Sequence, residues 1–369
     1  MKIVVTGAEG FLGWHLRCRL RAQGDHEVIP VSRSSFGRLS EFAADAEAIV
    51  HLAGINRATD DELVDGNIAL AQDVAAAVTV MKRPPRIVYA NSIRADDGTP
   101  YGSGKSSASR VIADAVERTA GTFVDVVLPN LFGEHGRPSY NSFVATFAHA
   151  AAAGVETEVD DRSVPLLHVQ DAAQVLIEGL SGTSRTEQPA GEPHGVAEVL
   201  ALLRGYADIY RSGEIPAISS VFERNLFNTY RAAVFESQTP IRFEQRRDER
   251  GTLVETIKVH GGAGQTFFST TVPGVTRGEH FHLTKIERFV VIGGRARIRV
   301  RRLFAHEVTS FDVNGDDPVA VDMPTMWTHD ITNTGDDELL TLFWTDSIFD
   351  PAHPDTYPEP VEISEEVLR

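Results

Sequence analysis

Short apolar segments alternate with helical patterns over the first 180 or so residues, and this alternation constrains the fold more than any other feature. The segments are IVV, EVIPV, AIVHLAG, RIVYANS, FVDVVLP and VPLLHV, and the first helical pattern carries Phe11, Leu12, Leu16 and Leu20. Strands that are apolar on both faces and separated by helices are typical of a parallel sheet with helices on both sides. We therefore predict a doubly wound α/β fold for this region.

The pattern changes near residue 241, where short strands are separated by Gly, Asp and Pro, as in FFSTTVPGV, RFVVIGG and RARIRVRRLF. Alternating strands with frequent turn residues predict an all-β sandwich or barrel. Between the two regions, residues 181–195 are predicted to form an exposed loop, and Val196–Tyr230 is predicted to be helical. We predict two domains, comprising residues 1–240 and 241–369.

The charge and composition of the chain exclude several classes of binding partner and of structure. The chain has 369 residues and a formal net charge of −17, which repels nucleic acid and anionic lipid, so we expect neither as a partner. No apolar run approaches the ~20 residues of a membrane span. Cys18 is the only cysteine, which excludes an internal disulfide. Because the first residues have the pattern of a strand and not of a signal peptide, we expect a cytoplasmic location.

Three glycines, Gly7, Gly10 and Gly13, lie between the first predicted strand and the first predicted helix, within TGAEGFLG. The first permits a tight turn, the second lets the backbone approach a pyrophosphate, and the third lets helix and strand pack closely. Free N–H groups at the start of the helix would then bind the phosphates. The alternative is a tight strand-to-helix turn that binds no ligand.

Arg33 follows the second predicted strand. In a dinucleotide-binding fold, an acidic residue near this position accepts a hydrogen bond from the ribose 2′-hydroxyl of NAD, whereas a basic residue neutralises the 2′-phosphate of NADP. Arg33 therefore favours NADPH as the cofactor. The alternative is an ordinary surface arginine in contact with solvent.

Tyr101 and Lys105 are four residues apart, in a chain with only five lysines and seven tyrosines. On a helix this spacing places both side chains on one face. A nearby ammonium stabilises phenolate and is expected to lower the pKa of Tyr101, so that the phenol exchanges a proton with a carbonyl or alcohol oxygen. Ser92, at the end of the RIVYANS segment, is placed to donate a hydrogen bond to the same oxygen; the alternative is an ordinary strand-end serine.

Together these residues resemble the short-chain dehydrogenase/reductase superfamily, particularly the extended members that act on nucleotide sugars. The resemblance covers residues 1–180 and rests on TGAEGFLG, HLAG (51–54), Asn67, NS (91–92) and YGSGK. It implies a Rossmann-type fold with Ser92, Tyr101 and Lys105 as the catalytic set. The residues implied in cofactor binding are Gly7, Gly10, Phe11, Leu12, Gly13, Arg33, Leu52, Ala53, Tyr101 and Lys105. Tyr101 follows Ser92 by only nine residues, fewer than in typical extended members, so the rim of the active site is expected to be trimmed.

The carboxyl-terminal region carries a histidine pair, His280 and His282, whose side chains project from the same face of a strand and can bind a divalent metal. The spacing resembles the two cupin motifs: Gly274-x5-His280-x-His282-x4-Glu287-x6-Gly294 and Pro324-x4-His329-x3-Asn333. It implies a jelly-roll barrel with His280, His282, Glu287 and His329 as metal ligands. Such a set suits zinc, iron, manganese or nickel. Met326 and Pro318 replace motif glycines, which is expected to loosen the turn near His329.

Other residues complete the predicted sites. Lys285 lies inside the first cupin motif and is a candidate base or substrate-phosphate contact; the alternative is an exposed loop lysine. Arg137 and Asn141 follow FGEHG and are candidate contacts to the nucleotide portion of the substrate; the alternative is loop packing. The metal could also be purely structural, or the barrel could be a sugar-binding module without chemistry.

The order of the two regions resembles the CapF (WbjC) family of bifunctional enzymes in capsular polysaccharide and O-antigen sugar biosynthesis. The segments that carry this resemblance are LPNLFGEHGRPSYNSFVATF (128–147), DERGTLVE (248–255), HFHLTKIERFVV (280–291) and WTDSIFDPAHPDTY (344–357). It implies a homodimer that acts on a UDP-linked 2-acetamido-2,6-dideoxy-hexos-4-ulose. A zinc-bearing cupin domain would invert C3, and an NADPH-dependent domain would reduce the C4 ketone, giving a 6-deoxy-L-talosamine nucleotide on the route to L-fucosamine.

The chemistry of a ketosugar fixes the order of these two steps. A C4 ketone acidifies the C3 proton, so a base can remove that proton if a donor or metal stabilises the enolate. Reduction destroys the ketone, so inversion must come first. Two alternatives stay open: a redox-neutral epimerase or dehydratase that retains NAD and has a non-catalytic cupin domain, and a redox-sensing regulatory protein.

Overall fold

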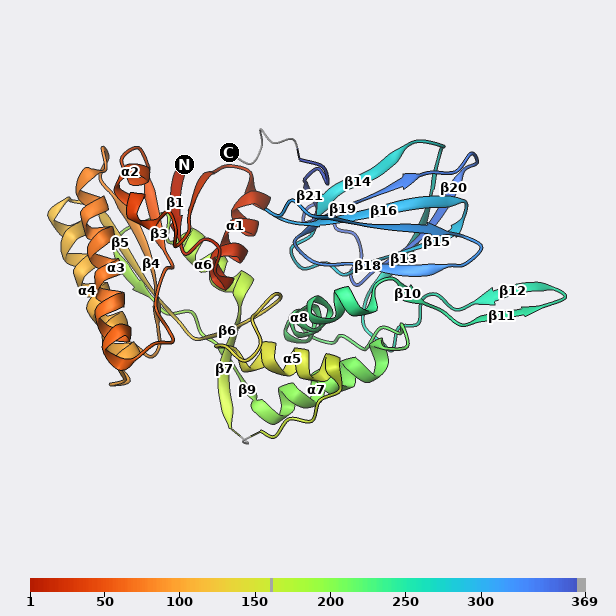
Figure 1. The fold of residues 1–369 in the computed structure, drawn as a ribbon, viewed down its shortest axis with the longest axis horizontal. Coiled ribbons are helices and arrows are strands. Elements are labelled where there is room, and N and C mark those ends of the chain that lie inside the picture. The colour runs from red at the N-terminus through yellow and green to blue at the C-terminus, as the bar shows by residue number, and fades with distance from the viewer. Residues whose placement is uncertain (160–161, 364–369) are drawn as a thin grey trace. The chain divides into compact units, whose positions relative to one another are not determined.

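The computed structural model describes residues 1–159 and 162–363, which form two compact units (Figure 1). The first unit comprises Met1–Phe132 and Ser163–His194, and the second comprises Gly133–Arg162 and the chain from Gly195 onward. Each unit contains a complete version of one predicted architecture. The predicted domain boundary at residue 240 follows the change in sequence pattern and stays a prediction.

The first unit is built on a six-stranded parallel sheet in the order β2-β1-β3-β4-β5-β8. Strand β1 pairs with β2 on one side and β3 on the other, so that Ile3 lies opposite Val28 and Ala48. The strands are β1 (Lys2–Thr6), β2 (Glu27–Val31), β3 (Ala48–His51), β4 (Arg86–Ser92), β5 (Thr122–Leu128) and β8 (Arg185–Glu187). This sheet confirms the predicted doubly wound fold.

Helices cover both faces of this sheet, as its apolar pattern predicts. Ile3 and Val5 of β1 pack in one core with α1 and α6, whereas Val4 packs in a second core with α2, α3 and α4. The helices are α1 (Phe11–Gln23), α2 (Leu39–Ala43), α3 (Asp60–Val80), α4 (Pro100–Arg118) and α6 (Val169–Glu178), with a 3₁₀ turn at Phe36–Arg38. Successive residues of a strand therefore serve opposite cores.

Two strands lie where the sequence predicted a loop. β8 completes the parallel sheet, and β9 (Glu192–Gly195) joins β6 (Asn130–Phe132) and β7 (Ser163–His168) in a small second sheet. The predicted loop at 181–195 is therefore wrong in part. Both strands are three or four residues long and rich in charged or turn-forming residues, so they carry no apolar alternation. β7 was predicted as a strand, but it belongs to the small sheet.

Helix α3 is long and apolar enough to cross a membrane by length and composition alone. Its residues Ala71, Val74, Ala77 and Val78 belong to the core on one face of the parallel sheet. Its first turn contains Asp60, Asp61 and Glu62, capped by Thr59. We therefore interpret α3 as a core helix of the first unit.

The second unit contains two five-stranded antiparallel sheets that enclose one apolar core, as predicted for a jelly roll. Their orders are β10-β18-β15-β20-β13 and β17-β16-β19-β14-β21, and β11 and β12 form a separate hairpin. The strands are β10 (Ile241–Arg242), β11 (Gln245–Asp248), β12 (Gly251–Val254), β13 (Gln265–Thr271), β14 (Thr276–Phe281), β15 (Glu287–Gly293), β16 (Arg295–Arg302), β17 (Val308–Asn314), β18 (Val319–Met323), β19 (Trp327–Asn333), β20 (Leu339–Thr345) and β21 (Tyr357–Pro358).

Three helices, α5 (Phe143–Ala153), α7 (Val196–Tyr210) and α8 (Val221–Gln238), also belong to the second unit. The predicted helical stretch is thus two helices, interrupted by a turn in which Gly213 has a φ of 81°. A buried polar network joins the helices to β18: Tyr210 donates to Asp322 at 2.7 Å, and Arg288 of β15 donates twice to the same carboxylate at 2.6 and 2.9 Å. The helices therefore pack with the β sheets through satisfied buried charges.

Candidate active sites

The glycine-rich turn after β1 has the geometry that its sequence predicts. Gly7 has a φ of 66°, and a Cβ there would lie 2.8 Å from the backbone nitrogen of Ala53. A Cβ on Gly13 would lie 2.1 Å from the Gly7 carbonyl oxygen, so helix α1 approaches the turn too closely for any side chain. Gly10 is the N-cap of α1 and has no side chain to block the first N–H groups. The turn can therefore receive a pyrophosphate.

A buried hydrogen-bond network holds the HLAG segment against this turn. The Thr6 hydroxyl accepts from the N–H groups of Leu52 and Ala53, both at 3.2 Å, and hydrogen bonds to His51 Nδ1 at 2.7 Å. Burial lowers the pKa of His51 to about 3, so its ring is neutral. Because the Thr6 oxygen already accepts two hydrogen bonds, its hydroxyl donates to Nδ1 of His51. The predicted cofactor contacts Phe11, Leu12, Leu52 and Ala53 are all partly buried.

Arg33 is exposed in the loop after β2. Serine residues flank Arg33 in the chain. The Ser32 N–H donates to Ser35 Oγ at 3.0 Å, and the hydroxyls of Ser32 and Ser34 lie 2.8 Å apart. These bonds hold the loop in a tight turn and leave the guanidinium of Arg33 on its surface. The arrangement suits a phosphate ligand that binds from solvent.

The structure brings Ser92, Tyr101 and Lys105 together at the carboxyl end of β4 and the first turns of α4. Thr99 caps α4 by accepting from the Gly102 N–H at 3.1 Å, which fixes the turn that carries Tyr101. Tyr101 hydrogen bonds to Ser92 through their side chains. The Lys105 ammonium donates to the Ala90 carbonyl at 2.5 Å and lies 4.2 Å from the centre of the Tyr89 ring. The predicted catalytic set is thus assembled on adjacent elements.

The electrostatics of this set differ from the sequence expectation. Burial raises the pKa of Tyr101, while Arg94 and the hydrogen bond with Ser92 act in the opposite direction. Burial also lowers the pKa of Lys105 to about 7, against a smaller upward influence of Asp125. Lys105 binds the Ala90 carbonyl and does not set the pKa of Tyr101 in this arrangement. The expected lowering of the tyrosine pKa is therefore absent from this geometry, because burial outweighs the nearby positive charges.

Asp125 and Asn91 support this site and were not predicted. Asp125 Oδ2 accepts from Asn91 Nδ2 at 3.0 Å and from the Ser109 hydroxyl at 2.5 Å. Asn91 Oδ1 in turn accepts from the Ser92 N–H at 2.9 Å. Burial raises the pKa of Asp125, and these hydrogen bonds and the charge of Lys105 oppose that shift. A chain of hydrogen bonds therefore runs from β5 to the serine at the end of β4.

Four side chains of the second unit converge inside its β sheets, with their potential ligand atoms all within 4.8 Å of one another. They are His280, His282, Glu287 and His329. His280 lies on β14 directly opposite His329 on β19, and Glu287 begins β15 in the other sheet. Glu287 Oε2 lies 3.1 Å from His282 Nε2 and 3.3 Å from His329 Nε2. Three imidazoles and one carboxylate at these separations fit a zinc-like divalent cation.

Burial keeps His280 and His329 in their ligand form. It lowers the pKa of His280 to about 3, helped by the neighbouring His329 and His282, and it lowers the pKa of His329. For Glu287, burial acts to raise the pKa, but hydrogen bonds with His282 and His329 hold it well below its ordinary value. A metal needs neutral imidazoles and an ionised carboxylate, and His280, His329 and Glu287 have those forms near neutral pH.

The turn before His329 keeps its shape without the motif glycine. Met326 is fully buried and has a φ of 60°, a conformation that a glycine would adopt without strain. Its N–H donates to the His282 carbonyl at 2.7 Å. That hydrogen bond and the buried side chain hold Met326 in this conformation, and the expected loosening of the turn stays a prediction.

The remaining predicted residues lie outside these two clusters. The Lys285 ammonium donates to the Pro354 carbonyl at 2.5 Å and to the Thr356 hydroxyl at 3.0 Å, so it is anchored to the carboxyl-terminal segment. Arg137 and Asn141 are exposed in the loop before α5, in the second unit, and the Arg137 guanidinium lies 5.3 Å from the centre of the Tyr140 ring. Their predicted contacts with the substrate stay predictions.

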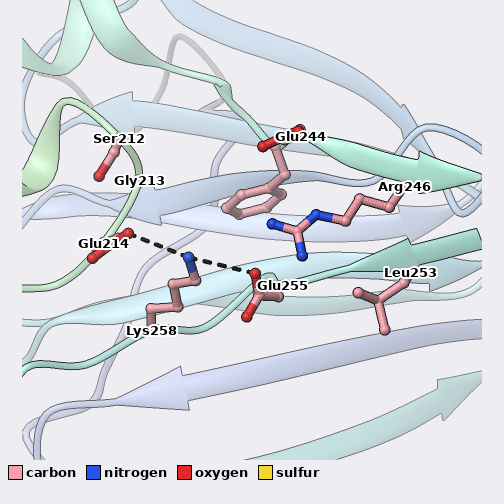
Figure 2. Close-up of a pocket in the computed structure, with 9 residues that line it drawn as sticks. Ser212, Gly213, Glu214, Glu244, Arg246, Leu253, Glu255 and Lys258 are labelled. Atoms are coloured by element: carbon pink, nitrogen blue, oxygen red, sulfur yellow. Dashed lines mark hydrogen bonds and ion pairs between the residues drawn. The ribbon is translucent and has the colours of Figure 1, made fainter.

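A cavity of about 260 Å³ lies between the turn after α7 and the hairpin of β11 and β12 (Figure 2). Figure 2 shows Lys258 between two carboxylates, with its ammonium 3.3 Å from Glu214 and 3.5 Å from Glu255. These ion pairs satisfy the charge of Lys258, and the cavity contains none of the predicted site residues. We assign no chemistry to it.

Two family models match the chain. Residues 3–188 match the NAD dependent epimerase/dehydratase family, and residues 246–357 match the polysaccharide biosynthesis C-terminal domain. The first match contains the glycine turn and the Ser92, Tyr101 and Lys105 set. The second contains the histidine cluster, so each candidate site lies within one matched region.

Individual relatives extend this similarity over nearly the whole chain. A UDP-2-acetamido-2,6-beta-L-arabino-hexul-4-ose reductase from Pseudomonas aeruginosa is 34% identical over 365 residues, which is 97% of this chain and 98% of that protein. The crystal structure of the capsular polysaccharide assembling protein CapF from Staphylococcus aureus is 32% identical, covers 98% of this chain and 100% of its own, and has a TM-score of 0.63. A UDP-N-acetylglucosamine 4-epimerase from Bacillus cereus, 21% identical with a TM-score of 0.50, covers 56% of this chain and 82% of its own, and shares the fold of that part.

Proposed function

Because this chain belongs to the CapF family of sugar-nucleotide enzymes, we propose that it is a bifunctional enzyme acting on a UDP-linked 2-acetamido-2,6-dideoxy-hexos-4-ulose. It inverts C3 at the histidine cluster and then reduces the C4 ketone with NADPH at Tyr101. The product is a UDP-6-deoxy-L-talosamine-type sugar on the route to L-fucosamine. One observation carries the proposal: a complete hydroxyl and lysine set and a complete metal-ligand set lie on one chain that aligns end to end with a ulose reductase.

The geometry at Tyr101 supports the reductive step. NADPH bound at the Gly7 turn supplies the hydride for C4. Tyr101 donates its proton to the C4 oxygen, and Ser92, its hydrogen-bond partner, donates a hydrogen bond to that oxygen. For Lys105 to stabilise the tyrosinate that remains, its ammonium must be protonated and must turn from the Ala90 carbonyl toward Tyr101. The exposed Arg33 favours NADPH over NADH by neutralising the 2′-phosphate.

The geometry of the histidine cluster supports the epimerising step. A divalent cation held there, which we propose is zinc, supplies positive charge that favours the enolate formed when C3 loses its proton. His280, His282 and His329 would hold it through ring nitrogens, and Glu287 would add one negative charge. Lys285 is the candidate for proton transfer at C3, and for that role its ammonium must leave the Pro354 carbonyl.

Deuterium exchange without NADPH tests the division of labour. The full chain is incubated in D₂O with the 4-keto sugar nucleotide, and C3 is followed by NMR. We expect deuterium at C3 in the wild type and in Tyr101→Phe, but not in His280→Ala. Exchange that persists in His280→Ala, or that disappears in Tyr101→Phe alone, contradicts the assignment of the two steps.

Oxidation of NADPH separates this function from a redox-neutral one. We expect one NADPH oxidised for each 4-keto sugar consumed. An enzyme that retains NAD would convert the sugar without net oxidation of NADPH, and a redox-sensing regulatory protein would bind the cofactor without turnover. We also propose that the chain acts in the cytoplasm and that it forms a homodimer. Light scattering after gel filtration tests the homodimer.

A further inference from the structure

The segment near the carboxyl end, WTDSIFDPAHPDTY (344–357), is not explained by either proposed step, yet it runs alongside the histidine cluster. Strand β21 pairs with β14 at the edge of its sheet, with Pro358 opposite His280 and Tyr357 opposite Phe281. The Glu359 N–H donates to the Glu279 carbonyl at 2.9 Å. The strand that carries His280 is therefore held on one side by this segment.

Asp355, immediately before β21, binds the backbone between two ligands of the cluster. Its carboxylate accepts from the N–H groups of Leu283, Thr284 and Lys285 at 2.9, 2.9 and 2.8 Å, and from the Thr284 hydroxyl at 3.0 Å. These residues connect His282 to the strand that begins at Glu287. The Lys285 ammonium in turn donates to the Pro354 carbonyl and the Thr356 hydroxyl, which lie on either side of Asp355 in the chain.

The backbone of Asp355 also contacts a ligand directly. His282 Nδ1 lies 2.6 Å from the Asp355 carbonyl oxygen, and a carbonyl can only accept, so Nδ1 carries the proton. The other ring nitrogen, Nε2, faces Glu287 at 3.1 Å and is the atom that points toward the other ligands of the cluster. Asp355 has a φ of 42°, a left-handed conformation that Asp and Asn tolerate better than most residues. This conformation and the side-chain bonds hold the carbonyl in position.

We propose that Asp355 is a positioning residue for the metal site. Its carboxylate holds the 283–285 backbone, and its carbonyl fixes the tautomer of His282 so that Nε2 is available as a ligand. This inference rests on the proposed function, since it concerns the same four ligands. Partners of the second ring nitrogen of a metal-bound histidine typically change metal affinity about 10- to 100-fold when they are lost.

Zinc affinity of the full-length chain tests the proposal, measured by competition with a chromophoric chelator. Asp355→Ala keeps the carbonyl but loses the carboxylate that holds it and the 283–285 backbone in place, so we expect zinc to bind about 10-fold more weakly than to the wild type, at the low end of that range. Asp355→Asn keeps one acceptor oxygen and tolerates the left-handed conformation, so its affinity should lie between the two. The matched control is Asp350→Ala, because exposed Asp350 accepts a backbone N–H from Ala352 at 2.9 Å in the same segment but contacts no ligand. Its affinity should not change.

A second measurement does not depend on whether the Asp355 variants fold. In the metal-free wild type with ¹⁵N-labelled histidine, the long-range ¹H–¹⁵N spectrum should show His282 protonated at Nδ1, with the signal assigned by its loss in His282→Gln. A proton on Nε2 instead overturns the inference. A folded Asp355→Ala variant that binds zinc within about twofold of the wild type also overturns it and leaves the proposed function intact. A wild-type chain that binds no zinc overturns the proposed metal site and this inference together.

Discussion

The two candidate sites are built in opposite ways. Ser92, Tyr101 and Lys105 come from one strand end and the next helix, so local geometry places them together. The histidine cluster collects ligands from β14, the residue after it, β15 and β19, which belong to two different sheets. The first site thus depends on one connection in the chain, whereas the second depends on correct packing of the whole β sandwich.

Burial also serves the two sites differently. At the reductase site it lowers the pKa of Lys105 to about 7, although the charged form is the one that stabilises a tyrosinate. At the histidine cluster it lowers the pKa of His280 to about 3, and the neutral form is the one that binds metal. Desolvation therefore opposes function at the first site and supports it at the second. Asp125, which raises the pKa of Lys105, partly offsets this effect at the first site.

The largest expected effect comes from Tyr101→Phe, which removes a single hydroxyl oxygen and should impair only the reaction at the first site. Tyr101→Phe should lower the rate of NADPH oxidation with the 4-keto sugar about 10²- to 10⁴-fold, because the C4 oxygen loses its proton donor. C3 deuterium exchange should stay at the wild-type rate. The control is Tyr206→Phe, which removes a hydroxyl that donates to the Glu223 carbonyl at 3.4 Å and should affect neither reaction. If both reactions fell together in Tyr101→Phe, the sites would not be chemically separate.

Removing the metal should affect only the second site. After dialysis against a chelator, we expect C3 exchange to fall at least about tenfold, because the enolate loses its positive partner. The affinity for NADPH, measured by fluorescence titration, should not change, because the N–H groups proposed to bind its phosphates belong to the start of α1 in the other unit. Added zinc should restore exchange. Loss of NADPH binding on dialysis would show that the two sites are coupled.

The contrast between local and distant assembly also explains what the sequence could predict. Strand and helix alternation, the glycine turn and the Tyr101 and Lys105 spacing are all short-range patterns, and the predicted doubly wound sheet and cupin-like β domain are confirmed. The four candidate metal ligands were predicted only through their resemblance to a spaced motif. Their own pattern, two histidines two residues apart, carries little information.

Residues that support the sites through distant contacts were missed. Asp125 reaches Asn91 across two neighbouring strands, and Asp355 reaches the 283–285 backbone from about 70 residues away in the chain. Nothing in their local sequence distinguishes them from other acidic residues. Short strands such as β8 escaped prediction for a related reason, because their pairing with β5 is decided by the sheet and not by their own residues.

A smaller effect is expected from changing the balance of charge around Lys105. Because the proposed role of Lys105 needs its protonated form and its pKa is about 7, kcat/KM for NADPH should fall by about tenfold per pH unit above that value. Asp125→Asn removes the carboxylate that raises this pKa, so the falling limb should move to lower pH. The control is Asp114→Asn, an exposed position on α4, whose profile should match the wild type. If the falling limb does not move in Asp125→Asn, Asp125 does not raise the pKa of the group that controls this reaction.

The smallest expected effect concerns the choice of cofactor at the first site. Arg33→Ala should weaken NADPH binding about tenfold and leave NADH binding unchanged, because one exposed guanidinium contact with a phosphate is lost. The ratio of the two dissociation constants, measured at several salt concentrations, checks this, since a surface charge contact weakens as salt rises. Arg21→Ala removes the same charge from the last turn of α1 and should leave the ratio unaltered. A ratio that stays constant in Arg33→Ala would mean that the hydroxyl-rich loop after β2 does not recognise the 2′-phosphate, and the proposed preference for NADPH would need another source.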